Sequence, residues 1–114
     1  MWIGSDALDL LMDQAEIARI SKALSDPTRL RIYAEISACR EIFCGELVEK
    51  HRLTPGTISH HLKILADANL IECRRQGQFI YNRSRPDTIR KYTRALAKIA
   101  VNKVARETKA ASSR

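Results

Sequence analysis

Apolar residues recur at intervals of three and four along most of this chain, the spacing that places side chains on one face of an α-helix. The pattern predicts a first helix from Asp6 to Leu24 with a broad apolar face. A second helix is expected to begin at Pro27, because Asp26 is a good N-cap and proline suits the first helical position. This second helix is apolar around most of its circumference, so we expect it at the centre of the fold.

A helix-turn-helix is predicted in the middle of the chain. It consists of a short helix from about Cys44 to His51, a turn at Arg52-Leu53, and a helix that begins at Pro55 after the N-cap Thr54. In DNA-binding versions of this motif the second helix enters the major groove. The N-terminal end of that helix also presents unpaired backbone N–H groups, which suit a phosphate.

The second of these helices, within residues 53–65, has two distinct faces at about 100° per residue. Its apolar face is formed by Ile58, His61, Leu62 and Leu65. The opposite face presents Gly56, His60 and Lys63, with Thr57 and Ser59 beside it. We expect the apolar face to be buried and the other face to meet DNA, with His61 either packed or touching a phosphate.

A β-hairpin is predicted directly after the helix-turn-helix. Residues 70–75 and 78–83 alternate in polarity around Gln76-Gly77, with glycine where a positive φ is needed. Such a hairpin is a wing, and its long donor-rich side chains can reach phosphates or the minor groove. The residues expected to contact DNA are Thr54, Gly56, Thr57, Ser59, His60, His61, Lys63, Arg74, Arg75, Gln76 and Gln78.

A last amphipathic helix is predicted from Pro86 to about residue 107. A winged domain of this length already has a core, so we expect this helix to pair with its twin and with the first helix in a homodimer. The predicted interface residues are Leu8, Leu11, Met12, Ile89, Tyr92, Leu96 and Ile99.

No internal repeat or linker divides the sequence, so residues 1–114 are expected to form a single domain. Its predicted parts are dimerisation helices at about 5–24 and 86–107, a helix-turn-helix at about 44–69 and a wing at about 70–84. The fold class is therefore mainly α with a small β-hairpin.

The net charge of the chain indicates the kind of partner that it binds. The chain has 20 Lys and Arg against 13 Asp and Glu, a formal net charge of +7 and a pI near 9.7. Residues 74–114 contain twelve basic residues and only two acids, so a polyanion would meet that region. Charge alone does not choose between DNA, RNA and an anionic membrane. No apolar run is long enough to cross a membrane and no secretory signal is visible, so we expect a cytoplasmic protein.

The three cysteines, Cys39, Cys44 and Cys73, are expected to be reduced thiols, because their number is odd and their spacing is sparse. Cys39 and Cys44 bracket the junction between the second and third helices. One interpretation is that all three are small packing residues. The other is a thiol sensor, which answers to oxidation or, with Cys73, to a three-coordinate As(III)-like ion. Adjacent His60 and His61 point about 100° apart, which disfavours a metal pair.

Four segments in order resemble the ArsR/SmtB-type winged-helix repressors of bacteria over roughly residues 15 to 85. They are ALSDPTRLRI at 23–32, GEL at 45–47, TISHHLKIL at 57–65 and RRQGQFIY at 74–81. The resemblance implies a homodimeric transcriptional repressor that binds a near-palindromic double-stranded DNA operator and is released by a metal, metalloid, redox or other small signal.

The two metal sites known in that family do not carry over to this sequence. The arsenic site uses Glu-Leu-Cys-Val-Cys-Asp-Leu, against which residues 41–47 place Phe43 and Gly45 at the thiolate positions. The other site needs Asp, His and Glu ligands on the last helix, where no His follows His61 and where Asp87 and Glu107 are too far apart. We therefore predict no metal site and no cofactor.

No phosphate-binding glycine loop, carboxylate pair or cysteine with a histidine base emerges, so an enzyme is not expected and no catalytic residue is predicted. Two alternatives to an inducible repressor remain open. One is a winged-helix module that binds an acidic protein partner. The other is a constitutive repressor without a small-molecule inducer.

Overall fold

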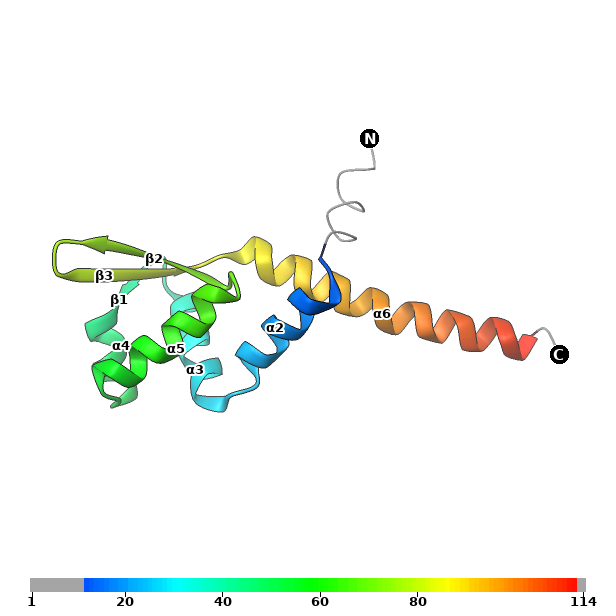
Figure 1. Cartoon of the computed structure of the whole chain (residues 1–114), viewed down its shortest axis with the longest axis horizontal. Helices are drawn as coiled ribbons and strands as arrows, with labels where there is room; N and C mark the ends of the chain where they lie inside the picture. The colour runs from blue at the N-terminus through cyan, green and yellow to red at the C-terminus, as the bar shows by residue number, and fades with distance from the viewer. Residues whose placement is uncertain (1–11, 113–114) are drawn as a thin grey trace, which may run out of the picture.

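The computed structural model describes the backbone of residues 12–112 and the side chains of residues 12–101 (Figure 1). The predicted interface residues Leu8 and Leu11 lie outside the described residues. The helices are α2 (Gln14–Leu24), α3 (Pro27–Ala38), α4 (Cys44–His51), α5 (Pro55–Asp67) and α6 (Pro86–Ser112). The strands are β1 (Ile42–Phe43), β2 (Ile71–Gln76) and β3 (Phe79–Ser84).

Side-chain caps determine where three of the helices begin. Asp13 accepts a hydrogen bond from the Glu16 backbone N–H at 2.8 Å and so starts α2. The predicted first helix began at Asp6, which is wrong for the described part, because Met12 and Asp13 are not helical and the cap fixes the start at Gln14. Asp26 and Thr54 cap α3 and α5 as predicted, each followed by proline at the first helical position.

The sheet has three antiparallel strands in the order β1-β3-β2. In β2 and β3, Ile71 lies opposite Ser84 and Gln76 opposite Phe79, so the tight turn is Gly77-Gln78, one residue later than predicted. Gly77 has a φ of +63°, the left-handed region that glycine adopts without strain. The strand β1, where Ile42 pairs with Asn82, was not predicted because two residues are too few to show alternation.

The hydrophobic core lies where α2, α3, α4 and α5 meet the sheet. Its fully buried members include Ile32 and Ile36 of the central helix α3 and Ile58 and Leu65 of α5. The buried face of α5 consists of Ile58, His61, Leu62 and Leu65, as its sequence pattern predicts. One side of α5 is therefore held by the core, and the opposite side is left for other contacts.

Helix α6 leaves the body of the fold and runs beyond it toward the C-terminus, at the end opposite the β2–β3 wing (Figure 1). Its first turns are fixed to α2, where the hydroxyls of Ser21 and Tyr92 lie 2.8 Å apart. The helix continues to Ser112 rather than ending near residue 107, because no glycine or proline interrupts it. The described fold is thus a winged helix-turn-helix with one long helix projecting from it, and it confirms the predicted fold class.

Candidate nucleic-acid interface

The outer face of α5 is open along its first two turns. Gly56, Thr57, Ser59, His60 and Lys63 are all exposed, although Ile58 between them is completely buried. A Cβ atom added at Gly56 would meet nothing within 4 Å, so a large flat surface can approach the backbone there. This face has the small side chains, hydroxyls and backbone N–H groups that fit the floor and walls of a nucleic-acid groove.

The start of α5 is held by a pair of threonines. The Thr57 backbone N–H donates to Thr54 Oγ1 at 3.2 Å, and the Thr54 hydroxyl donates to Thr57 Oγ1 at 2.9 Å. Because Thr54 is the cap, its own side chain is committed to the helix, whereas the side chains of Ser59 and His60 are exposed. Lys63 lies farther along and pairs with Asp67 at 3.4 Å, but both side chains are mostly exposed and the pair is weak.

His61, which the sequence analysis included among the DNA contacts, is buried in the structure, and only 9% of the residue is exposed. Its Nδ1 atom lies 3.3 Å from Nη1 of Arg29, which is equally buried. Burial lowers the pKa of His61, and the Arg29 and His60 charges lower it further, whereas the Asp26 carboxylate raises it. His61 is therefore a packed residue that faces the chain's interior, which was the other possibility the sequence left open.

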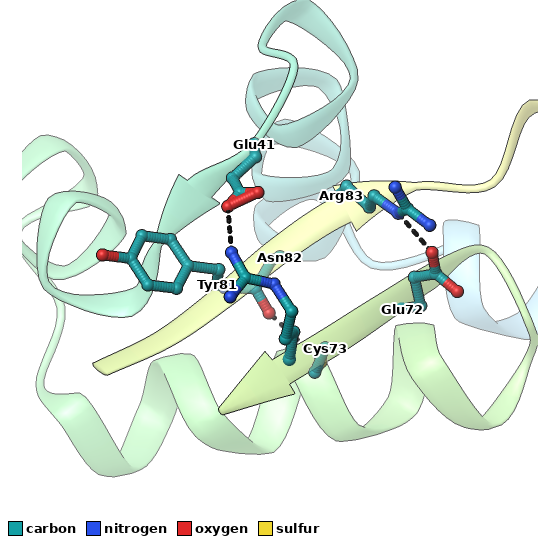
Figure 2. A pocket seen from close by; sticks show the side chains of 7 residues that line it. Glu41, Glu72, Cys73, Tyr81, Asn82 and Arg83 are labelled. Carbon is teal, nitrogen blue, oxygen red and sulfur yellow. Dashed lines mark hydrogen bonds and ion pairs between the residues drawn. The ribbon is translucent and has the colours of Figure 1, made fainter. Parts of the chain in front are cut away.

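At the wing, the two arginines predicted to contact DNA differ in how many contacts their side chains make within the chain. The Arg74 guanidinium lies over the Tyr81 ring at 4.8 Å from its centroid and pairs with Glu41 at 2.5 Å (Figure 2). It also donates to Gln76 at 2.6 Å. Arg75 is exposed and forms no ion pair within the part of the chain that the structure describes. The wing therefore presents Arg75 to a partner, whereas Arg74 is engaged in joining the wing to the segment before β1.

Two of the three cysteines, Cys44 and Cys73, contact Asn82, a residue that the sequence analysis did not single out. This side chain of β3 is 1% exposed and accepts from the Cys73 thiol at 3.1 Å, while its amide nitrogen donates to the Ile42 carbonyl at 3.2 Å and faces the Cys44 sulfur at 3.5 Å. Burial raises the pKa of the Cys73 thiol, and the nearby Cys44 raises it further. Cys44 is thus linked to Cys73 through the Asn82 side chain.

A shallow cavity of about 280 Å³ opens beside this group, between Glu41, Glu72, Arg74 and Arg83 (Figure 2). Its walls are ion-paired, because Arg83 binds Glu72 and Arg74 binds Glu41. Among the described residues no group of three or more His, Cys, Asp and Glu side chains is arranged to hold a metal ion. Within the same residues, no helix has both the length and the apolar character that a membrane span requires.

Comparison with known proteins agrees with this geometry. A helix-turn-helix domain model matches residues 24–74. The chain is 38% identical over 66 residues to the arsenical resistance operon repressor of Staphylococcus xylosus, a match of 58% of this chain and 62% of that repressor. It is 40% identical over 62 residues to the transcriptional repressor SdpR of Bacillus subtilis, which covers 54% of this chain and 68% of the relative.

Two solved structures share the fold. An ArsR-like transcriptional regulator from Rhodococcus sp. RHA1 superposes with a TM-score of 0.76 at 27% identity, over 83% of this chain and 89% of that one. A homodimeric winged helix-turn-helix DNA-binding domain, Mb0332 from Mycobacterium bovis, superposes with a TM-score of 0.62 at 27% identity, over 90% of this chain and 91% of that one.

The chain belongs to the ArsR/SmtB-type family of winged helix-turn-helix transcription regulators, as its sequence motifs predicted. These relatives are repressors or regulators of transcription, which agrees with the prediction that the chain is not an enzyme. The chain spans just under two thirds of the length of the arsenical repressor that it matches.

Proposed function

We propose that this protein is a sequence-specific DNA-binding repressor of transcription, in which α5 enters the major groove and the wing contacts the adjacent backbone. The observation that supports the proposal best is the division of α5 into a face buried in the core and an open face of small and polar residues. Gly56, Thr57, Ser59 and His60 would meet base edges, and Lys63 and Arg75 would hold phosphates. The excess of basic charge gives the sequence-independent part of the affinity.

The same proposal includes a homodimer. In α6, Leu96 is 44% exposed, Ile99 47% and Val101 64%, which is unusual for three large apolar side chains within six residues of one helix. Ile89 and Tyr92 of the predicted interface instead pack on the chain's own core, together with Met12. A dimer through the outer part of α6 would place two copies of α5 about one DNA turn, or ~34 Å, apart on a near-palindromic operator.

A genome-wide footprint of the purified protein tests the proposal. We expect a small number of protected near-palindromic sites, with binding that falls steeply as salt rises. A protein-interaction module would leave no preferred site at any salt concentration. A sequence preference that survives when α5 is altered at His60 and Ser59 together would show that another surface selects the site.

The cysteines support a second, narrower proposal, that a soft ion or an oxidant acts at the base of the wing. The supporting observation is that the Cys44 and Cys73 thiols contact the same buried Asn82 amide, which joins β1 and α4 to the wing. DNA titrations of wild type and Cys44→Ser with As(III), with peroxide and with neither would decide it. If all of these titration curves superimpose, the protein is either a constitutive repressor or a repressor that responds to another signal.

A further inference from the structure

Arg29 is a buried cation at the point where α2, α3 and α5 meet. Its backbone N–H donates to the capping carboxylate of Asp26 at 2.9 Å. Its guanidinium turns back to the end of α2, where Nε donates to the Ala23 carbonyl at 2.6 Å and Nη2 to the Lys22 carbonyl at 3.3 Å. The last carbonyls of a helix have no partner within it and lie at the negative end of its dipole, so a buried arginine is well placed there.

The remaining nitrogen of the same guanidinium faces α5. Nη1 of Arg29 lies 3.3 Å from Nδ1 of His61. Arginine is protonated at every accessible pH and offers only donors, so Nδ1 of His61 must be the acceptor. The ring is then neutral, with its proton on Nε2. One planar group therefore joins the C-terminal end of α2 to the helix whose opposite face is open.

We propose, on the basis of the DNA-binding function proposed above, that Arg29 is a positioning residue for α5 that acts through neutral His61, and that protonation of His61 releases this contact and weakens DNA binding. Protonation would place an Nδ1–H donor and a positive charge against the donor and charge of Nη1. Neither group can accept, so the two must separate. His61 shares its helix with Ser59 and His60, so its displacement moves the face that meets the groove.

Burial and two of the charged groups around His61 oppose a charge on its ring, whereas one carboxylate favours it. Burial has the largest effect, and Arg29 of α3 and His60 of α5 add to it, so that the pKa of His61 stays below the ordinary value. Asp26, which precedes α3, favours a charge on His61, and its carboxylate accepts a hydrogen bond from the Arg29 backbone N–H. The contact is therefore formed at neutral pH and opens only as the pH falls below the ordinary histidine value of 6.5.

The test measures the affinity of the full chain for a duplex selected at about pH 7.5 from a random library, followed down to about pH 5.5. We expect the affinity of wild type to fall by up to about tenfold per pH unit, the limit for one linked proton. The contact with Arg29 is made by His61 and not by the exposed His60. The His60→Gln variant should therefore keep the fall.

Two substitutions separate positioning from simple packing. In His61→Asn, the side-chain oxygen occupies about the place of Nδ1 and accepts from Arg29 without titrating, so the affinity at neutral pH should be kept and the fall abolished. In His61→Leu the acceptor is lost, so binding should be weaker at every pH and without the fall. A fall that persists in His61→Asn, or that disappears in the control His60→Gln, overturns the proposal. Wild-type affinity in a folded His61→Leu variant would overturn it too.

A second measurement needs no DNA and keeps the two proposals separable. In ¹⁵N NMR spectra of the free protein, the amide signals of Thr57 and Ser59 should titrate with the His61 ring in wild type and stay fixed in His61→Asn. If no duplex is preferred in the selection, the repressor function fails, while this titration still decides whether His61 moves α5. Amide signals that ignore the His61 titration would overturn the inference even if the DNA function stands.

Discussion

Helices α5 and α6 are both amphipathic, yet their apolar faces are buried to different extents. In α5 the apolar side chains Ile58, Leu62 and Leu65 are buried by the rest of the chain. In α6 the first turns are covered, and of the side chains that the structure describes farther along, Leu96, Ile99 and Val101 remain substantially exposed. The comparison shows that the same sequence periodicity can describe a helix whose packing is complete within one chain and a helix whose packing is not.

The exposed faces of α5 and α6 also differ in their chemistry. The open face of α5 is small and polar, which suits a hydrated, charged partner such as DNA. The open part of α6 is apolar, and an apolar surface of this kind gains free energy when another apolar surface covers it. One helix is therefore suited to a partner of different chemistry and the other to a second copy of itself.

The largest effect on stability should come from a substitution on the buried apolar face of α5. Leu65→Ala removes a side chain with no exposed surface, and we expect it to lower the free energy of unfolding by about 2–5 kcal/mol. Urea denaturation at a fixed protein concentration measures the change. The matched control is Leu96→Ala in α6, whose cost should depend on protein concentration because its side chain is covered only in a dimer. Equal, concentration-independent costs at both sites would remove the contrast.

The next effect concerns association. Leu96→Asp places a charge within the proposed interface of α6, where it would be desolvated without a partner. Sedimentation should show wild type as a dimer at micromolar concentration and this variant as a folded monomer. The control is Thr93→Asp, at an exposed residue of the same helix whose hydroxyl donates to the Ile89 and Arg90 carbonyls of that helix. A wild-type monomer that still binds its operator would refute the dimer.

Sequence periodicity was sufficient for the parts of the fold that rest on local rules. The capped starts of α3 and α5 follow from Asp26-Pro27 and Thr54-Pro55, because capping is a contact within three residues. The buried face of α5 follows from helical geometry alone. The start of α2 did not follow, because the apolar pattern continues through Asp13 whereas the Asp13 cap fixes the start at Gln14.

Two further unpredicted features, strand β1 and the contact between Arg29 and His61, depend on contacts between distant segments. Strand β1 exists because Ile42 pairs with Asn82, forty positions away in the chain. Asn82 is an unfavourable residue in a strand, and that was the signal that could have marked it as a buried polar contact. Arg29 lies in the DPTR motif, but its contact with His61 spans 32 positions. No local pattern identifies the partner of a buried arginine.

A smaller effect separates the contacts expected on the open face of α5. Lys63→Ala should weaken binding to all duplexes alike and reduce the slope of log affinity against log salt by about one unit, because one phosphate contact is lost. His60→Ala should instead reduce the difference between the selected duplex and a scrambled one. Arg75→Ala on the wing should behave like Lys63→Ala. Loss of sequence preference in all three variants would contradict this division between base and phosphate contacts.

The smallest effect is the dependence of folding stability on pH, and it concerns the buried side of α5. Because the pKa of His61 is lowered on folding, the unfolded chain binds this proton more readily than the folded one. The contribution is fully present above the usual histidine value of 6.5 and is lost as the pH falls through that value toward the folded pKa. His61→Asn should flatten urea-derived stability in this window.

Asp26 defines a second window lower on the pH scale. Its pKa is lowered mainly because the carboxylate accepts the Arg29 backbone N–H, so its contribution is present above 3.8 and is lost as the pH falls below that value. Asp26→Asn keeps the capping oxygen but does not titrate, and should remove the second loss while leaving the first. If Asp26→Asn removes the loss near pH 6.5 instead, His61 is not the group whose burial couples stability to pH.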